Sequence, residues 1–433
     1  MSMAPETSTV KNALSAHAAI GLLAGALLYI VALSGSVLVF YHELQQIEQP
    51  GLEMTSIEPA ALERAAASLM ARETGNPRTA HLYFSLPSGD SPRTIGYTDT
   101  QKVLIDQDGR IADELQTSWS EFLYSLHYEL TVPSPLGIII VGVLGVMMLT
   151  LSLSGIIAHP RIFRDAFRLR ARDGNGVGLT DWHNRLSVWT LPFILMIALT
   201  GAVIGLGALT AEGVAARYFG GDTEQVYAPL FGAEHPVDLA PTELPAIAKS
   251  LEYMKATYPE VEVTFITVHD PMTKGQTIQA MGEHPRRLVF GEYYNFDAAG
   301  TFMDTTGLAD GELGQQAAAS NYKLHFGNYG GLIVKIAYFL LGSALTVICA
   351  TGTFIWLGKR RRRGIFEPRL RAAWHGVIWG TPAALAVTFI ARLAIGNGAP
   401  FLAIFWLTLA AAMFGAVLAV KGSEPAIRLQ PAE

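Results

Sequence analysis

The sequence predicts an all-α transmembrane helical bundle of six spans, with a four-span pseudo-twofold core, a C-terminal hairpin and two small α+β extracytoplasmic domains. Three observations predict this fold class: the composition, six long apolar segments and an internal repeat. Of the 433 residues, 50% are hydrophobic and only 16% are charged, whereas soluble domains carry about 25% charged residues. The composition therefore excludes an ordinary soluble enzyme, and it is too apolar for a disordered chain.

Six segments are long and apolar enough to cross a bilayer, which takes about 20 residues. None of them contains Asp or Glu, and the first lacks a small-residue cleavage site, so we interpret it as a retained anchor rather than a signal peptide. The six spans cover Ala18–Tyr41, Leu136–Ala158, Leu186–Leu209, Gly331–Leu357, Gly376–Ala394 and Phe401–Val420.

Basic residues predict the orientation, because Lys and Arg gather in the cytoplasmic loops of membrane proteins. Two short loops are rich in them and hold Arg161, Arg164, Arg168, Arg170, Arg172, Lys359, Arg360, Arg361, Arg362, Arg363, Arg369 and Arg371. Both termini are therefore expected in the cytoplasm, and the two long connections in the periplasm of a bacterial inner membrane. Beside a span, the basic run at 359–363 indicates topology rather than a nucleic-acid site, so no nucleic-acid partner is expected.

The predicted order along the chain has six parts. They are the N-terminus with span one (1–41), a first outer domain (42–135), spans two and three (136–209), a second outer domain (210–330), span four (331–357), and a basic loop with spans five and six (358–433). Each outer domain is predicted as one helix followed by three strands. The helices are Glu58–Glu73 and Thr242–Tyr258, and the strands are Thr79–Leu86, Arg93–Tyr97, Gln101–Ile105, Val261–Val268, Gln276–Met281 and Arg287–Asn295.

An internal repeat relates the two halves of the chain. Four histidines recur in matching places, each with a Ser/Thr-Gly step in the nearby span: His17 with Ser34-Gly35, His183 with Thr200-Gly201, His127 with Ser154-Gly155, and His325 with Thr351-Gly352. Parallel repeats are related by an axis along the membrane normal. His17 is therefore expected to face His183 at the cytoplasmic end, and His127 to face His325 at the outer end. Two facing imidazoles at each depth suit two non-covalent, bis-His haems b, and Cys349, the single cysteine, excludes a C-x-x-C-H attachment site.

Other residues leave alternatives open. Gly35 lies five helical turns beyond His17 on the same face, where it would leave room for a macrocycle or simply let helices pack closely. His159 could replace one of the inner ligands or hold a haem propionate, whereas His42 and His375 are interpreted as interfacial. By position, Arg185 and Arg161 would neutralise the inner propionates, and Lys323 the outer ones. His81, His235, His269 and His284 lack metal-ligand spacing and are interpreted as surface residues.

The same motifs resemble those of the PepSY-associated transmembrane family, also described as PiuB-like or iron-regulated membrane proteins. The resemblance rests on Ser15-Ala16-His17, Ser125-Leu126-His127, Asp181-Trp182-His183-Asn184-Arg185 and Lys323-Leu324-His325-Phe326-Gly327. It covers roughly residues 10–360 and implies that the outer domains are PepSY modules. It also implies an inner-membrane ferric-siderophore reductase with two haems b, whose axial ligands are His17, His183, His127 and His325. One departure is that Ala18 follows His17, where the family often has a basic or aromatic residue.

The favoured interpretation is transmembrane electron transfer to a ferric siderophore or another periplasmic Fe(III) chelate. The cytoplasmic loops are too short for a flavin or nicotinamide domain, and no G-x-G-x-x-G begins a βαβ unit. Electrons would therefore come from membrane quinol or a separate cytoplasmic donor. Two alternatives stay open. A transporter would usually show intramembrane acids or broken helices, and a PepSY-type ligand-sensing or protease-regulating membrane protein would not require paired histidines.

Overall fold

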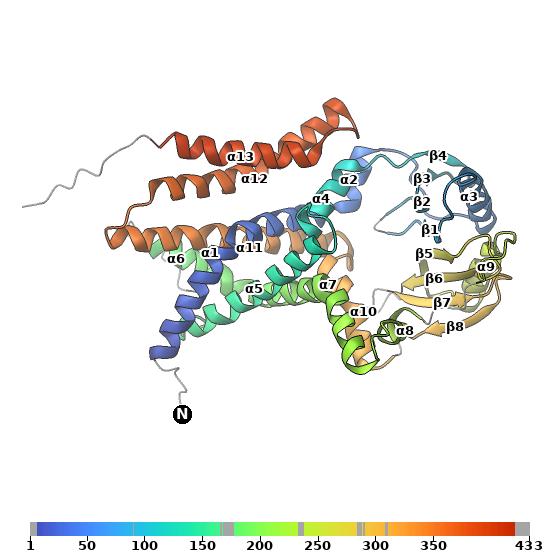
Figure 1. The fold of residues 1–433 in the computed structure, drawn as a ribbon, viewed down its shortest axis with the longest axis horizontal. Coiled ribbons are helices and arrows are strands. Elements are labelled where there is room, and N and C mark those ends of the chain that lie inside the picture. Colours follow the sequence, from blue (N-terminus) through green and yellow to red (C-terminus); the bar gives the residue numbers. More distant parts are fainter. Residues whose placement is uncertain are drawn as a thin grey trace, which may run out of the picture.

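The computed structural model describes residues 7–89, 91–164, 167, 177–232, 238–283, 288, 291–307 and 311–420. Arg168, Arg170, Arg172, His235 and His284 lie outside these ranges, as do both chain ends. The described chain forms a helical bundle with a sheet layer beyond one end of it (Figure 1). Six of its helices are long and apolar enough to cross a membrane. The protein is therefore a multi-pass membrane protein.

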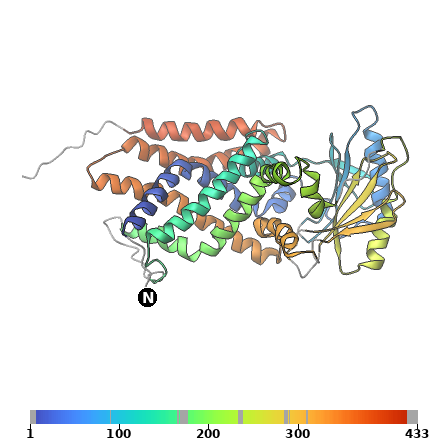
Figure 2. The same ribbon diagram turned by 60° about the horizontal axis from the view of Figure 1, so that its bottom comes forward.

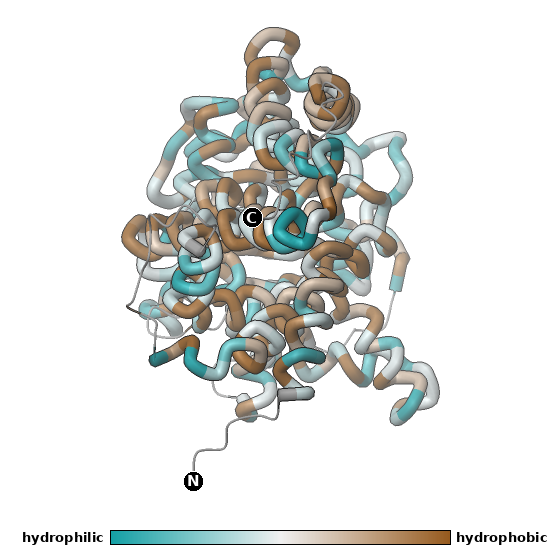
Figure 3. The backbone as a smooth tube through the Cα atoms, turned by 90° about the vertical axis from the view of Figure 1, so that its left-hand side faces the viewer, coloured by the Kyte–Doolittle hydropathy of each residue, from teal (hydrophilic) through white to brown (hydrophobic). Residues whose placement is uncertain are grey.

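The spans carry apolar side chains on their outer sides. They are α1 (Thr7–Leu38), α5 (Leu136–Ala158), α7 (Leu191–Tyr218), α11 (Gly331–Arg362), α12 (Pro368–Ile395) and α13 (Phe401–Leu418). Ile333 is 81% exposed and Leu418 is 82% exposed, and apolar stretches are spread over the helices when the bundle is viewed end-on (Figure 3). Such side chains would be unfavourable in water, so these surfaces face lipid.

The bundle core follows the repeat. Helix α1 packs against α5 and α11, and α5 packs against α7. A short helix precedes α5, namely α4 (Ser118–Glu129), and another precedes α11, namely α10 (Leu313–Phe326). The first short helix packs on α1 and the second on α7. Each short helix therefore lies against the span that begins its own repeat.

The third span differs from its prediction. The sequence predicts one span over Leu186–Leu209, but the structure has α6 (Val177–Trp189), a break at Thr190, and then α7, which continues to Tyr218. Pro192 explains the break, because proline lacks the N–H that the preceding turn would use and disfavours a helical residue before it. Span one has no proline, so α1 passes His17 without interruption.

The two outer connections share one antiparallel sheet. Its strands are β1 (His81–Ser85), β2 (Thr94–Tyr97), β3 (Lys102–Ile105), β4 (Ile111–Glu114), β5 (Glu262–His269), β6 (Thr277–Glu283), β7 (Glu292–Phe296) and β8 (Phe302–Thr306). The order is β4-β3-β2-β1-β5-β6-β7-β8, so the strands of the two predicted domains meet at β1 and β5, where Tyr83 lies opposite Thr267. One apolar core, which includes Leu62, Phe84, Ile266 and Phe296, extends across this join.

Helices α3 (Pro59–Arg72) and α9 (Ile247–Thr257) cover the face of the sheet that is turned away from the bundle (Figures 1 and 2). Two shorter helices, α2 (Tyr41–Glu48) and α8 (Glu224–Phe231), lie between the spans and the sheet. The sequence pattern did not predict the edge strands β4 and β8, because their residues are largely exposed and do not alternate cleanly between polar and apolar. Strand β7 begins at Glu292, and its predicted start at Arg287 lies outside the described residues.

Candidate metal centres

The inner pair of predicted histidines meets between α1 and α6. The ring centres of His17 and His183 are 6.4 Å apart, and the two ring planes are perpendicular, at 90°. His183 lies on α6, which the break at Thr190 separates from α7 and which packs against α11. The structure therefore places His183 opposite His17, as the repeat predicts.

The outer pair lies between the two short helices. His127 of α4 and His325 of α10 have ring centres 6.1 Å apart, with an angle of 34° between their planes. Burial, together with repulsion from the facing histidine, lowers the pKa of His325 to about 3 and that of His183 to about 4. Both imidazoles are therefore neutral near pH 7, which is the form that can bind a metal.

The ring separations match what one metal ion between two imidazoles requires. Two metal–imidazole bonds of about 2 Å each, with about 1 Å more from each nitrogen to its ring centre, add to about 6 Å. Within the described ranges, no group of three or more His, Cys, Asp or Glu side chains could hold a metal ion. Pairs rather than clusters suit a metal whose other ligands belong to a macrocycle.

Hydrogen bonds fix the orientation of each imidazole through its Nδ1 atom. His17 Nδ1 lies 3.0 Å from the carbonyl oxygen of Leu151, and His127 Nδ1 lies 2.9 Å from that of Val31. A carbonyl oxygen only accepts, so Nδ1 carries the proton and donates it. The lone pair of each ring is then on Nε2, which is left to bind a metal.

In the second repeat, threonine hydroxyls fix the orientation of the imidazoles. His183 Nδ1 lies 2.9 Å from Thr351 Oγ1, and His325 Nδ1 lies 2.9 Å from Thr200 Oγ1. Each hydroxyl donates its one proton to a carbonyl of its own helix, 2.9 Å away for Thr351 and 2.8 Å away for Thr200. Its oxygen therefore accepts from Nδ1–H. All four imidazoles thus share one tautomer, with Nε2 unprotonated.

The four glycines of the repeat lie against these same imidazoles. A Cβ atom added to Gly35 would lie 2.5 Å from Cε1 of His127, and one added to Gly201 would lie 3.0 Å from Cε1 of His325. The corresponding distances are 3.4 Å from Gly155 to His17 and 3.6 Å from Gly352 to His183. The glycines make room for the ligand ring, whereas the sequence had suggested room for a macrocycle or for helix packing. Each Ser/Thr-Gly step therefore belongs to the histidine of a neighbouring helix.

A cavity of about 840 Å³ adjoins the inner pair. Both histidines line it, together with His159, and apolar side chains such as Leu28 and Met148 line its deeper part. At its other end the lining is basic and includes Lys11, Lys359, Arg360, Arg362 and Arg363. The cavity therefore combines an apolar interior, two imidazoles and a cationic rim, which suits a flat apolar ligand with acidic groups at one edge.

Three residues predicted beside the sites form contacts of their own. Arg185 is buried with its guanidinium 3.9 Å from the carboxylate of Asp181. The cations that line the cavity belong to α1, to α11 and to Arg363 at the end of α11. His159 Nδ1 lies 3.3 Å from the carbonyl oxygen of Gly155. Lys323 forms an ion pair with Glu283 of β6, so its ammonium group is directed at the sheet.

Two other histidines meet in a way that the sequence pattern missed. His81 and His269 are opposite one another on β1 and β5, and their ring centres are 5.1 Å apart. The sequence indicates only surface residues here, since nothing in it shows that the two outer connections share a sheet. His375 is exposed, and its ring packs on Phe354 at 4.8 Å.

A family model that describes the PepSY-associated TM region matches residues 14–359. The chain belongs to this family. The match extends from α1 almost to the end of α11, and it includes both histidine pairs of this PepSY-associated transmembrane protein. Helices α12 and α13 lie beyond it.

One curated relative is the uncharacterized protein PA4219 of Pseudomonas aeruginosa. It is 26% identical to this PepSY-associated protein over 273 residues, which is 55% of this chain and 64% of the relative. The chain thus spans just under two thirds of that relative's length. The name of this relative states no activity.

Proposed function

We propose that this protein is a transmembrane oxidoreductase of the bacterial inner membrane that binds two haems b and reduces a periplasmic Fe(III) chelate, such as a ferric siderophore. The observation that carries the proposal is the two histidine pairs, with ring centres 6.4 Å and 6.1 Å apart. Among the residues that the structure describes, the hydrogen bonds of these four imidazoles are made through Nδ1, which leaves Nε2 for a metal. The pairs lie toward opposite ends of the span bundle, which is the arrangement that electron transfer across a membrane needs.

Haem b fits the donor set at both centres. The iron of a b-type haem can take one imidazole nitrogen on each face of the porphyrin. Gly35, Gly155, Gly201 and Gly352 leave space for the imidazoles, and the single cysteine leaves no thiol pair for covalent attachment. When bound, the haems would supply one-electron redox chemistry at iron.

The chain's own residues would hold and tune these groups. Each Nδ1–H bond fixes the ring and makes Nε2 a stronger donor, because a hydrogen-bonded imidazole is more basic. At the inner centre, the apolar lining would exclude water, and the cationic rim, with Lys359 and Arg360, would pair with the haem propionates. Arg185 and His159 remain predicted contributors to the same site.

The orientation proposed from the basic loops puts the inner pair toward the cytoplasm and the sheet in the periplasm. Membrane quinol or a separate cytoplasmic donor would then supply the electrons. Each Fe(III) in the outer compartment would take one electron and become Fe(II). Reduction lowers the charge of the metal, which weakens its bonds to the hard oxygen ligands of the chelate and releases iron.

The visible spectrum of the purified protein tests this proposal. We expect a Soret band, sharp α and β bands on reduction, and close to two haems per chain. The ring planes are 90° apart in the inner pair and 34° apart in the outer pair. They should therefore give two different low-spin electron paramagnetic resonance signals, since axial-ligand arrangement tunes the iron. Colourless protein from haem-replete cells would contradict the proposal.

Single substitutions assign the two signals. His127→Ala and His325→Ala should abolish the same one of the two signals, and His17→Ala and His183→Ala the other. His375→Ala is the control, because this exposed histidine belongs to neither pair. If the variants of one pair affect different signals, the pairing is wrong.

A further inference from the structure

The helix that carries His127 lacks a side-chain cap from its own N-cap residue and ends without a glycine. The residue before its first turn, Thr117, makes no side-chain capping hydrogen bond. At the other end, Leu130 and Thr131 adopt φ values of 54° and 58°, a region that residues other than glycine enter at a cost. The backbone groups at the ends of α4 are therefore not satisfied by a cap of its own.

Its counterpart in the repeat is locally well defined. Helix α10, which carries His325, begins with a capping box in which Glu312 and Gln315 satisfy each other's backbone groups. It ends at Gly327, whose φ of 68° costs glycine little. The two outer ligand helices thus differ in how their ends are stabilised.

At the N-terminal end of α4, the missing cap is supplied from outside. The carboxylate of Glu48 accepts hydrogen bonds from the backbone N–H groups of Trp119 and Ser120, at 3.0 Å and 2.8 Å. A carboxylate in this position also interacts favourably with the helix dipole. The side chain of Glu48 is fully buried and pairs with Arg392 of α12, whose Nε lies 3.0 Å from Glu48 Oε1. Arg392 also donates to the carbonyl of Gln116, at 2.9 Å.

At the C-terminal end, α13 provides a second contact. The indole Nε1 of Trp406 donates to Thr131 Oγ1 over 2.9 Å. Thr131 is one of the two residues with positive φ. The hydrogen bond therefore stabilises the turn that ends α4.

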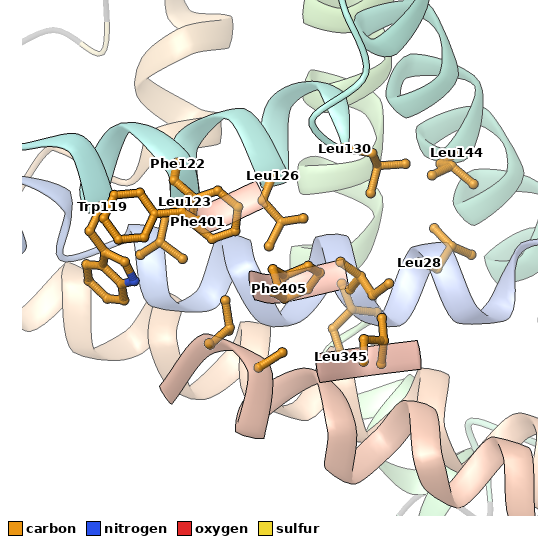
Figure 4. Close-up of a cluster of buried hydrophobic side chains, with 14 of the residues drawn as sticks. Leu28, Trp119, Phe122, Leu123, Leu126, Leu130, Leu144, Leu345, Phe401 and Phe405 are labelled. Atoms are coloured by element: carbon orange, nitrogen blue, oxygen red, sulfur yellow. The ribbon is translucent and has the colours of Figure 1, made fainter. Parts of the chain in front are cut away.

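Between the two ends, the hairpin covers one side of α4 with apolar side chains (Figure 4). Phe122 packs against Phe401 and Phe405, with ring centres 6.0 Å and 5.8 Å apart. Trp119 lies 4.8 Å from Phe389 and donates to Thr388 Oγ1 at 3.0 Å. These contacts bury the apolar face of α4 and leave His127 to face His325.

We propose that the α12–α13 hairpin is a clamp that positions His127, and that Arg392 and Trp406 are positioning residues for the outer metal centre. The inference rests on the proposed function in one respect only, namely that the outer metal centre holds haem. It gives a role to the two spans beyond the family match. It also makes the outer centre asymmetric, since α4 packs on both helices of the hairpin, whereas α10 packs on α7 and α8.

The first test compares Arg392→Gln and Trp406→Phe with Trp379→Phe, which alters a 71% exposed side chain on the same hairpin. A potentiometric titration with spectroscopic detection follows both haems. In the two clamp variants we expect the midpoint potential or the occupancy of the outer haem to change, with the inner haem unaltered. The control variant should match the wild type. Equal changes of midpoint potential or occupancy at both haems, or no change at either haem, would contradict the proposal that the hairpin positions His127.

The second test does not depend on haem. Hydrogen exchange of the full-length protein measures how often the amides of α4 and α10 open. Loss of a hydrogen bond to a charged group should make α4 amides exchange about tenfold faster in Arg392→Gln, while α10 stays unchanged. Trp406→Phe, a milder change, should accelerate the C-terminal turn of α4. If the wild-type protein holds no haem, the proposed function fails, but this measurement still tests whether the hairpin positions α4. Unchanged exchange of the α4 amides in Arg392→Gln would contradict that role of the hairpin.

Discussion

At the scale of single residues, the central feature is one arrangement used four times. A histidine donates its Nδ1 proton to the Ser/Thr-Gly step of a neighbouring helix, either to the hydroxyl or to the carbonyl three residues earlier. The serine or threonine, or the carbonyl before it, fixes the tautomer, and the glycine admits the ring. The four contacts differ in tightness, which makes them distinguishable by experiment.

The glycine contacts predict a graded response to alanine. Gly35→Ala would put a methyl group 2.5 Å from His127, so the ring must move, whereas Gly352→Ala would put one 3.6 Å from His183, an ordinary contact distance. We expect Gly35→Ala to destabilise the fold by about 1–3 kcal/mol and to weaken the outer centre alone. Thermal unfolding and bound-haem content measure the two effects. Gly352→Ala is the matched control, and equal behaviour of the two variants would contradict this account.

At the scale of elements, the decisive features are breaks and ends. Pro192 separates α6 from α7, and Gly327 ends α10. In the outer sheet, Glu73 at the end of α3 accepts hydrogen bonds from Thr98, Thr100 and Gln101 in the turn between β2 and β3. This carboxylate therefore attaches the helix to the sheet.

Glu73 predicts how the stability of the outer layer depends on pH. Desolvation alone would raise the pKa of its carboxyl, but hydrogen bonds from Thr98, Asn76, Gln101 and Thr100 outweigh it and lower the pKa to about 2. The ionised form is stabilised in the folded state, so this contribution is complete above the unfolded pKa of about 4.3 and is lost as the pH falls toward 2.

We expect Glu73→Gln to cost about 1–3 kcal/mol at pH 7 and to flatten the pH dependence of unfolding between about pH 5 and pH 2. Thermal unfolding of the full-length protein across this range measures both effects. Glu58→Gln, at an exposed site at the start of α3 without a side-chain cap, should leave the curve unchanged. If the unfolding temperatures of Glu73→Gln and of the wild type depended on pH in the same way, the prediction would be wrong.

At the scale of the whole molecule, a span bundle carries a single sheet layer at one end. Because β1 and β5 pair, the two outer connections form one layer. This layer lies beyond the end of the bundle at which α4 and α10 are found (Figure 1). The outer histidine pair thus lies on the side of the bundle nearest the sheet, and the cationic rim of the inner cavity lies on the opposite side.

The proposed orientation predicts which surface each end reaches. With the native thiol removed by Cys349→Ser, a cysteine introduced by Gln107→Cys in an exposed turn of the sheet should react with a membrane-impermeant maleimide once the outer membrane is permeabilised. Arg369→Cys, at an exposed site in the first turn of α12, should react only after the inner membrane is also opened. The reverse pattern of labelling would show that the charge-based orientation is wrong.

The sequence by itself determined the six-span membrane class, because long apolar segments without carboxylates have few alternatives to crossing a bilayer. It also predicted which histidines pair, because a repeat in the chain implies a symmetry in space, and the structure brings His17 to His183 and His127 to His325. Within the outer connections, the local pattern predicted α3, α9 and six of the eight strands.

Only the tertiary structure decided which groups surround those histidines. No local signal shows that Gly35 lies against His127 or that Arg392 holds Glu48, since each contact joins residues far apart in the chain. The merging of two predicted domains into one sheet has the same cause: strand pairing between β1 and β5 depends on where the spans place their ends. Apolar periodicity is a property of one element, whereas the tautomer of an imidazole and the cap of a helix depend on whichever element packs against it.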